Sequence, residues 1–102
     1  MAQQGERLFN HYTCGYCHVQ DGTGRAPSLV GIYGKPEKLA SGEMRVVDEA
    51  LIRQALIYPN SVPVAGFAPI MPTFQGQFTE EQILQLISYV KSLGSQERTN
   101  GK

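Results

Sequence analysis

One short segment, Cys14-Gly15-Tyr16-Cys17-His18, holds both cysteines of the chain and one of its two histidines. Two cysteines separated by two residues and followed at once by a histidine form the attachment pattern of a c-type haem. Each thiol can form a thioether with one of the two vinyl groups of haem, and the spacing matches the separation of those groups. The imidazole of His18 then lies beneath the iron, where a ring nitrogen can bind it. The segment therefore predicts covalent haem c attached at Cys14 and Cys17, with His18 as an iron ligand.

Two other chemistries use the same residue types. A redox dithiol usually follows a strand and opens a helix at its first cysteine, whereas here a predicted helix precedes Cys14 and a glycine-rich loop follows His18. A zinc site needs four ligands, and His11, Cys14, Cys17 and His18 supply that number. The neighbours Cys17 and His18 would be strained by binding one ion, however. Both alternatives stay open at this point, and haem attachment is favoured over them.

A second iron ligand separates an electron carrier from a haem with an open coordination position. Methionine sulfur and imidazole nitrogen are common haem ligands, and the chain offers Met1, Met44, Met71 and His11. Met1 is terminal, Met44 is expected to pack inward from a hairpin strand, and His11 is expected on the surface. Met71 is flanked by two prolines, which stiffen a loop that has no helix or strand to hold it. Met71 is therefore the predicted second ligand.

Pro27 lies in the loop that follows the motif. Its carbonyl is placed to accept a hydrogen bond from the ring N–H of His18 that does not face the iron. Such a bond fixes the tautomer and orientation of a metal-binding imidazole. Pro27 is therefore a predicted part of the site.

Helical signals lie at both ends of the chain. Apolar residues recur at helical spacing over 3–12, directly before the motif. Thr79 and Gln82 form a capping box that opens a last helix, and Gly94 is expected to end it. The polar residues 95–102 are expected to fray.

The middle of the chain is rich in glycine and proline. Residues 21–36 and 60–77 contain no periodic run. Between them, 38–40 and 44–47 flank a Ser-Gly-Glu turn and predict a short hairpin, and a helix with an aspartate at its N-cap follows over 49–58. The two irregular stretches are not expected to form hydrogen-bond ladders of their own. A bound haem offers them an apolar surface to cover, so the fold is expected to depend on haem.

The composition predicts an ordered domain and argues against a nucleic-acid-binding or membrane-spanning protein. The 102 residues are 41% hydrophobic and 18% charged, which predicts one ordered domain over 1–102. Nine basic and nine acidic side chains give zero formal net charge, which argues against a nucleic-acid partner. No apolar run approaches the ~20 residues that span a bilayer. No membrane contact by this domain itself is expected.

Taken in order, these features resemble the class I cytochrome c fold over nearly the whole chain. A first helix, the haem motif, Gly24-x-x-Pro27-x-Leu29, Met71-Pro72 and a last helix with Tyr89 follow one another as in that family. The resemblance implies an all-α fold of about three to five short helices wrapped round one haem c, with a small hairpin near 38–47. It also implies site residues: Cys14 and Cys17 as anchors, His18 and Met71 as iron ligands, and Pro27 and Leu29 in the haem pocket.

A narrower resemblance lies in the loops, which are similar to the cytochrome c domain fused to subunit II of caa-type haem–copper cytochrome c oxidases. It is carried by Ser41-Gly42-Glu43, Val47-Asp48-Glu49, Ile52-Arg53, Pro59-Asn60, Val64-Ala65-Gly66 and Met71-Pro72-x-Phe74-x-Gly76. This resemblance implies the C-terminal domain of subunit II, which delivers electrons to the copper centre of the oxidase. The implied partners are that copper domain and an upstream donor: another cytochrome, an iron–sulfur protein or a respiratory complex. The chain carries neither the copper-site sandwich nor the transmembrane hairpin of a whole subunit II.

The family attaches haem on the outer side of the bacterial membrane, which implies a periplasmic or extracytoplasmic location, tethered in a membrane complex. The chain begins Met1-Ala2-Gln3 without an export signal, so either a signal was removed or the domain belongs to a larger exported protein. The expected function is one-electron transfer, with no substrate turned over by the domain itself. A free-standing periplasmic carrier is the alternative. Met71 argues against a haem enzyme or gas sensor with an open sixth position.

Overall fold

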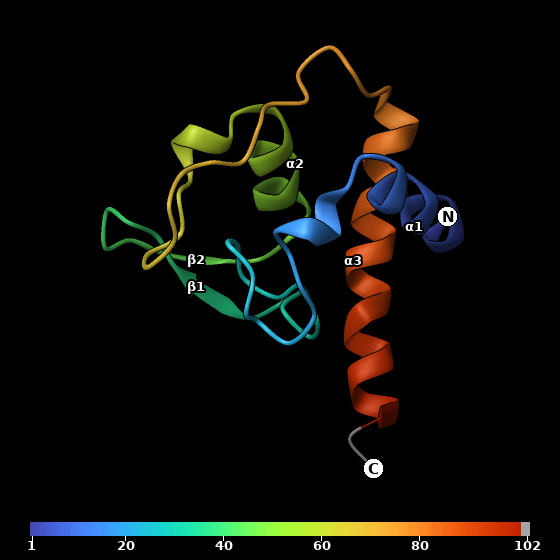
Figure 1. Ribbon diagram of the computed structural model, residues 1–102, viewed down its shortest axis with the longest axis horizontal. Helices are drawn as coiled ribbons and strands as arrows, with labels where there is room; N and C mark the ends of the chain where they lie inside the picture. Colours follow the sequence, from blue (N-terminus) through green and yellow to red (C-terminus); the bar gives the residue numbers. More distant parts are fainter. Residues whose placement is uncertain (101–102) are drawn as a thin grey trace.

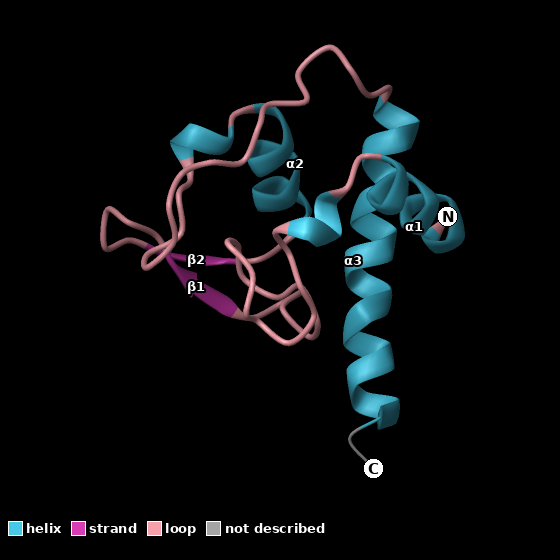
Figure 2. Cartoon of the chain, in the orientation of Figure 1, coloured by secondary structure: helices cyan, strands magenta, loops and turns pink. Residues whose placement is uncertain are grey.

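The computed structural model describes residues 1–100, with side chains described through residue 94. In this part of the chain three α-helices, two short 3-10 helices and one hairpin follow in the order α1, η1, β1, β2, α2, η2, α3 (Figure 2). Helices α1 and α3 lie together on one side of the molecule, while α2 and the hairpin lie on the other, with η1 between the two sides (Figure 1). The predicted helical fold with a small hairpin is confirmed.

Helix α1 spans Ala2–His11 and crosses α3, which spans Glu80–Asn100. The crossing is close because Gly5 is buried there: a Cβ at Gly5 would lie 2.0 Å from the backbone oxygen of Gln85. Beside this contact the rings of Phe9 and Tyr89 pack with their centroids 5.2 Å apart. The crossing places the end of α1, and so the start of the haem motif, against α3.

The last helix begins as predicted but does not end as predicted. The N–H of Thr79 donates to Oε1 of Gln82 at 2.9 Å, and the N–H of Gln82 donates to Oγ1 of Thr79 at 3.1 Å, which confirms the capping box. The predicted end at Gly94 is wrong, because α3 continues to Asn100. Gly94 does not adopt the left-handed backbone of a helix-ending glycine, and the residues after it include no proline. Residues 101–102 of the predicted frayed tail lie outside the described residues. No helix within residues 1–100 is long and apolar enough to cross a membrane.

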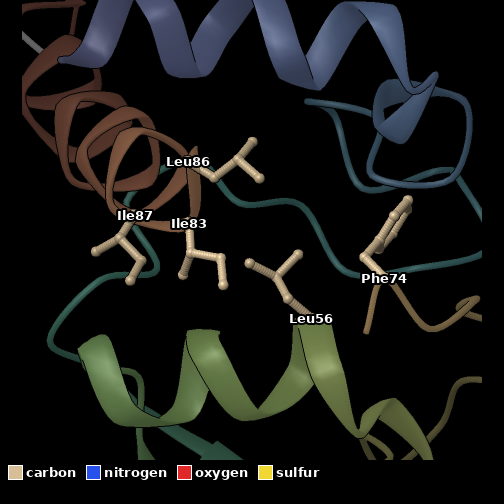
Figure 3. Close-up of a cluster of buried hydrophobic side chains, with 5 residues drawn as sticks. All are labelled: Leu56, Phe74, Ile83, Leu86 and Ile87. Atoms are coloured by element: carbon tan, nitrogen blue, oxygen red, sulfur yellow. The ribbon is translucent and has the colours of Figure 1, made fainter. Parts of the chain in front are cut away.

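Helix α2 spans Glu49–Ile57 and begins at the predicted cap. The carboxylate of Asp48 accepts a hydrogen bond from the N–H of Leu51 at 2.8 Å. The helix ends one residue earlier than predicted, and Pro59–Ser61 then forms η2, which overlaps the start of the stretch 60–77 predicted to be irregular. Exposed ion pairs join α2 to α3 through Lys91 with Glu49 and through Arg53 with Glu80. A buried apolar cluster links the two helices, with Leu56 from α2, Ile83, Leu86 and Ile87 from α3, and Phe74 from the loop that connects them (Figure 3).

The hairpin consists of β1, Pro36–Lys38, and β2, Met44–Val46, paired antiparallel with Glu37 opposite Arg45. Its first strand lies earlier than the predicted 38–40. The reason is a second partner: Leu39 forms a bridge with Val64, and the N–H of Ala40 donates to the carbonyl of Pro63 at 2.7 Å. The hairpin is thereby fixed to the loop that follows η2, and this loop is not wholly irregular.

Candidate functional site

A cavity of about 430 Å³ lies at the centre of the fold, within the ~300–1,000 Å³ typical of cofactor sites. Its walls include residues of the α2–α3 cluster and of a second buried cluster formed by Leu39, Val47, Leu51 and Val62. Most of the lining side chains are apolar. The described core is therefore built around this cavity.

The haem motif forms one compact turn on the cavity wall. Thr13 adopts a left-handed backbone with φ of 56°, which turns the chain from α1 into η1, Cys14–Tyr16. The N–H of His18 donates to the carbonyl of Cys14 at 3.0 Å and closes the turn. Cys14, Cys17 and His18 all line the cavity, so the structure brings the predicted anchors and the first predicted ligand together.

The imidazole of His18 is held in one orientation by Pro27. Nδ1 of His18 lies 2.9 Å from the Pro27 carbonyl oxygen. A carbonyl can only accept, so Nδ1 carries the proton and the neutral ring keeps an unprotonated Nε2. Burial lowers the pKa of His18 below its ordinary value, and the bond to Pro27 opposes this only in part. The predicted hydrogen bond is confirmed, and the ring is in the neutral form that binds metals.

The loop that carries Pro27 is packed closely on the motif. The N–H of Ala26 donates to the carbonyl of Cys17 at 3.1 Å. A Cβ at Gly24 would lie 2.1 Å from that same oxygen, so only glycine permits this approach. Leu29, farther along the loop, also lines the cavity, as predicted.

Met71 reaches the cavity from a segment far away in the sequence. It is half-buried, lines the cavity and packs against the α2–α3 cluster. Its loop is fixed to the end of α2: the N–H of Phe74 donates to the Leu56 carbonyl at 2.8 Å, and the Thr73 hydroxyl donates to the Ile57 carbonyl at 2.6 Å. Hydrogen bonds to α2 thus add to the stiffness that the flanking prolines provide.

The other candidate ligands lie outside the cavity. Met1 and Met44 are 57% and 56% exposed, and His11 is exposed at the end of α1 as predicted. The expectation that Met44 packs inward is wrong. Strand residues alternate between faces, and in β2 the inward residue is Arg45. Among the described methionines, Met71 alone lines the cavity.

A comparison with protein families identifies the family of this chain. The family model for cytochrome c matches residues 2–94. The chain belongs to the cytochrome c family. A comparison with curated proteins found no match. As a class I cytochrome c, the domain carries covalently bound haem c with its iron, and it is an electron-transfer module that is not itself catalytic.

The residues of this site fit a bound haem better than a redox dithiol or a zinc site. Cys14 and Cys17 form no disulfide with each other, and burial, ahead of the nearby Cys17, raises the pKa of the Cys14 thiol although a backbone hydrogen bond lowers it. A raised pKa is the opposite of what a reactive dithiol needs, and a helix precedes the motif where a dithiol has a strand. Within the described residues, no three His, Cys, Asp or Glu side chains are placed to hold a metal ion, so the zinc hypothesis is unsupported. The apolar cavity beside Cys14 and Cys17 is what a covalently anchored macrocycle requires.

Proposed function

We propose that this cytochrome c anchors its haem through Cys14 and Cys17, binds the iron with His18 and Met71, and transfers one electron at a time. The observation that carries the proposal is that all four side chains line one apolar cavity. Haem c supplies the Fe(II)/Fe(III) couple. A haem with two protein ligands has no open position for a substrate, so the domain acts as a carrier.

The protein's contribution is to keep the surroundings of the iron unchanged during electron transfer. The bond from His18 to Pro27 holds the imidazole, and the attachment of the Met71 loop to α2 holds the thioether. The apolar walls exclude water, whose rearrangement would otherwise accompany each change of charge. A methionine ligand raises the reduction potential relative to other haem ligand sets.

The absorption spectrum of the purified oxidised holoprotein tests the ligand assignment. Methionine bound to ferric haem gives a far-red charge-transfer band, which we expect to observe. A high-spin ferric spectrum without this band would indicate an open sixth position. It would then favour the haem enzyme or gas sensor over the carrier.

We further propose that the domain is the C-terminal part of subunit II of a caa-type haem–copper oxidase and delivers its electron to the copper centre. The support comes from the loops that resemble such domains, which form turns and helix starts in this fold. Ser41–Glu43 turns the hairpin, Asp48 caps α2, and Pro59 opens η2. The proposed partners are the copper domain and an upstream donor, and the proposed location is the periplasmic or extracytoplasmic side of a bacterial membrane.

The balance of charge also supports a tethered domain. Nine acidic and nine basic side chains give the polypeptide no formal net charge, whereas long-range capture of a partner by electrostatic steering needs a surface of one sign. A partner linked in the same chain is already present at high effective concentration. Electron transfer within subunit II would not need steering.

Two measurements separate the fused domain from a free-standing periplasmic carrier. The coding sequence upstream of Gln3 should encode a copper domain if the proposal holds. The reduced cytochrome domain, mixed with that copper domain in a stopped-flow instrument, should then lose its reduced haem spectrum as the copper is reduced. A copper domain loaded with redox-inert zinc is the control. A gene that encodes only an export signal before the cytochrome would establish the free-standing carrier instead.

A further inference from the structure

The central residue of each hairpin strand is charged and turns toward the interior, whereas the exposed face carries Pro36, Met44 and Val46 together with Lys38. In each strand only the central residue is half-buried, Glu37 in β1 and Arg45 in β2. Their neighbours Met44 and Val46 are 56% and 52% exposed. Antiparallel hairpins commonly do the reverse and bury their apolar face. The inward position of Glu37 therefore needs an explanation other than packing.

Glu37 lines the haem cavity. Among the described residues that line it, Glu37 and Arg25 are the two with a formal charge at neutral pH. Arg25 is exposed to solvent on the loop beside Cys17, whereas Glu37 is half-buried. A charge next to an apolar cavity acts over a lower effective dielectric constant than a charge in water. Glu37 is thus the acidic side chain whose field extends into the cavity.

No described side chain forms an ion pair with this carboxylate. Within residues 1–94, Glu37 forms neither an ion pair nor a side-chain hydrogen bond. Arg45 is its partner across the strands, but Nη1 of Arg45 donates to Oε1 of Gln54 at 3.5 Å. Glu37 is therefore not held in a direct ion pair, and its charge acts on a group inside the cavity alongside the opposite charge of Arg45 on the facing strand.

We propose that Glu37 lowers the reduction potential of the haem and so opposes the increase in potential that Met71 produces. Oxidation adds one positive charge at the iron, and a nearby carboxylate stabilises the oxidised form more than the reduced form. The inference rests on the proposed function, since it requires the haem to occupy this cavity. It explains why a carboxylate is placed where an apolar residue would pack better.

The test compares variants of the holoprotein by spectroelectrochemical titration of the haem. Glu37→Gln removes the charge and keeps the shape, and we expect a positive shift of the midpoint potential. Glu37→Asp keeps a carboxylate and should stay close to the native value. The matched control is Glu43→Gln, an exposed residue in the loop of the same hairpin that does not line the cavity. Its shift should be smaller and should diminish with added salt, because exposed charges are screened.

The outcomes separate this inference from the proposed function. An equal shift in Glu37→Gln and Glu43→Gln, or no shift in either, would overturn the role of Glu37 while the haem spectrum stays native. A Glu37→Asp protein that shifts as far as Glu37→Gln would also overturn it, because the charge would not be the cause. If the native protein bound no haem at all, the proposed function itself would fail first.

Discussion

At the scale of single residues, the site depends on which candidate iron ligands are buried from solvent. His18 is buried enough to stay neutral and is oriented by Pro27. Met71 is half-buried on the cavity wall, while the sulfur-bearing alternatives Met1 and Met44 are mostly exposed. A thioether in bulk solvent competes poorly for iron because nothing holds it in position. Burial and fixed orientation therefore distinguish the ligand from chemically equal side chains.

The first prediction follows from this distinction. Met71→Ala should abolish the far-red band of the oxidised protein and give a high-spin or water-ligated haem. The reduction potential should fall, within the range of about 0.8 V that axial ligands span. Met44→Leu is the control and should leave spectrum and potential unchanged, since Met44 lies outside the cavity. The reverse pattern, with the band lost only in Met44→Leu, would contradict the assignment.

Which residues form the site was predictable, but the orientation of some was not. The spacing of Cys14, Cys17 and His18 is determined by the chemistry of one macrocycle, so it is visible in the sequence alone. The direction of Met44 depends on which face of a three-residue strand turns inward. So short a strand contains no repeat of the two-residue period from which a face can be inferred. The role proposed for Glu37 was missed for the same reason.

At the scale of elements, local capping rules succeeded and long-range pairing did not follow from the sequence. The bonds at Thr79 and Asp48 join residues three positions apart, so short motifs specify them. Leu39, which was predicted in the first hairpin strand, pairs instead with Val64, which lies far along the chain. At Gly94 a local signal failed. A glycine ends a helix only where the following residues leave the helical conformation, and α3 continues past Gly94.

The helix crossing gives a second prediction, on stability. Gly5→Ala should destabilise the fold by about 1–3 kcal/mol, because the new Cβ would lie 2.0 Å from the backbone oxygen of Gln85 and force the helices apart. Gly94→Ala is the matched control within α3, where the nearest atom is 4.0 Å away. It should stabilise by about 0.5–1 kcal/mol through helix propensity. Denaturant unfolding of the holoproteins measures both, and stabilisation by both variants would disprove the close crossing.

At the scale of the whole molecule, the two apolar clusters line a shared cavity, and Ile52 packs against both of them. Leu56 and Leu86 of one cluster and Leu51 and Val62 of the other line its walls. Apolar surface that borders a cavity gains little from burial until something fills it. The fold is accordingly expected to be completed by the cofactor.

The third prediction concerns folding without haem. The double variant Cys14→Ala, Cys17→Ala should yield a haem-free chain without a cooperative thermal transition, because it loses apolar contact worth ~25 cal/mol per Å² covered. Circular dichroism and calorimetry would follow the transition against the holoprotein. Each single cysteine variant is a control that retains one anchor and should show intermediate stability. A sharp, native-like melt of the haem-free double variant would show that the polypeptide core suffices.

The rim of the cavity suggests how the molecule meets its redox partner. Tyr16 is 82% exposed and Ile70 47% exposed, and both also line the cavity, as do the exposed Ala68 and Pro69. Arg25 is the one exposed charged residue among the described lining residues. A partner that approaches this rim meets apolar surface, which is not screened by salt. Charge would contribute little to its capture.

The fourth prediction is therefore a weak salt dependence of electron transfer between the cytochrome domain and the copper domain proposed as its partner, studied as separate proteins. From low to high ionic strength, the bimolecular rate should change far less than the ~10-fold to 1,000-fold enhancement that steered pairs gain. Tyr16→Ala should slow the reaction at every salt concentration, because apolar contact does not depend on screening. Tyr58→Ala, an exposed tyrosine that does not line the cavity, should leave the rate unchanged. A steep fall with salt would show instead that charges such as Lys35, Lys38 or Glu43 make the contact.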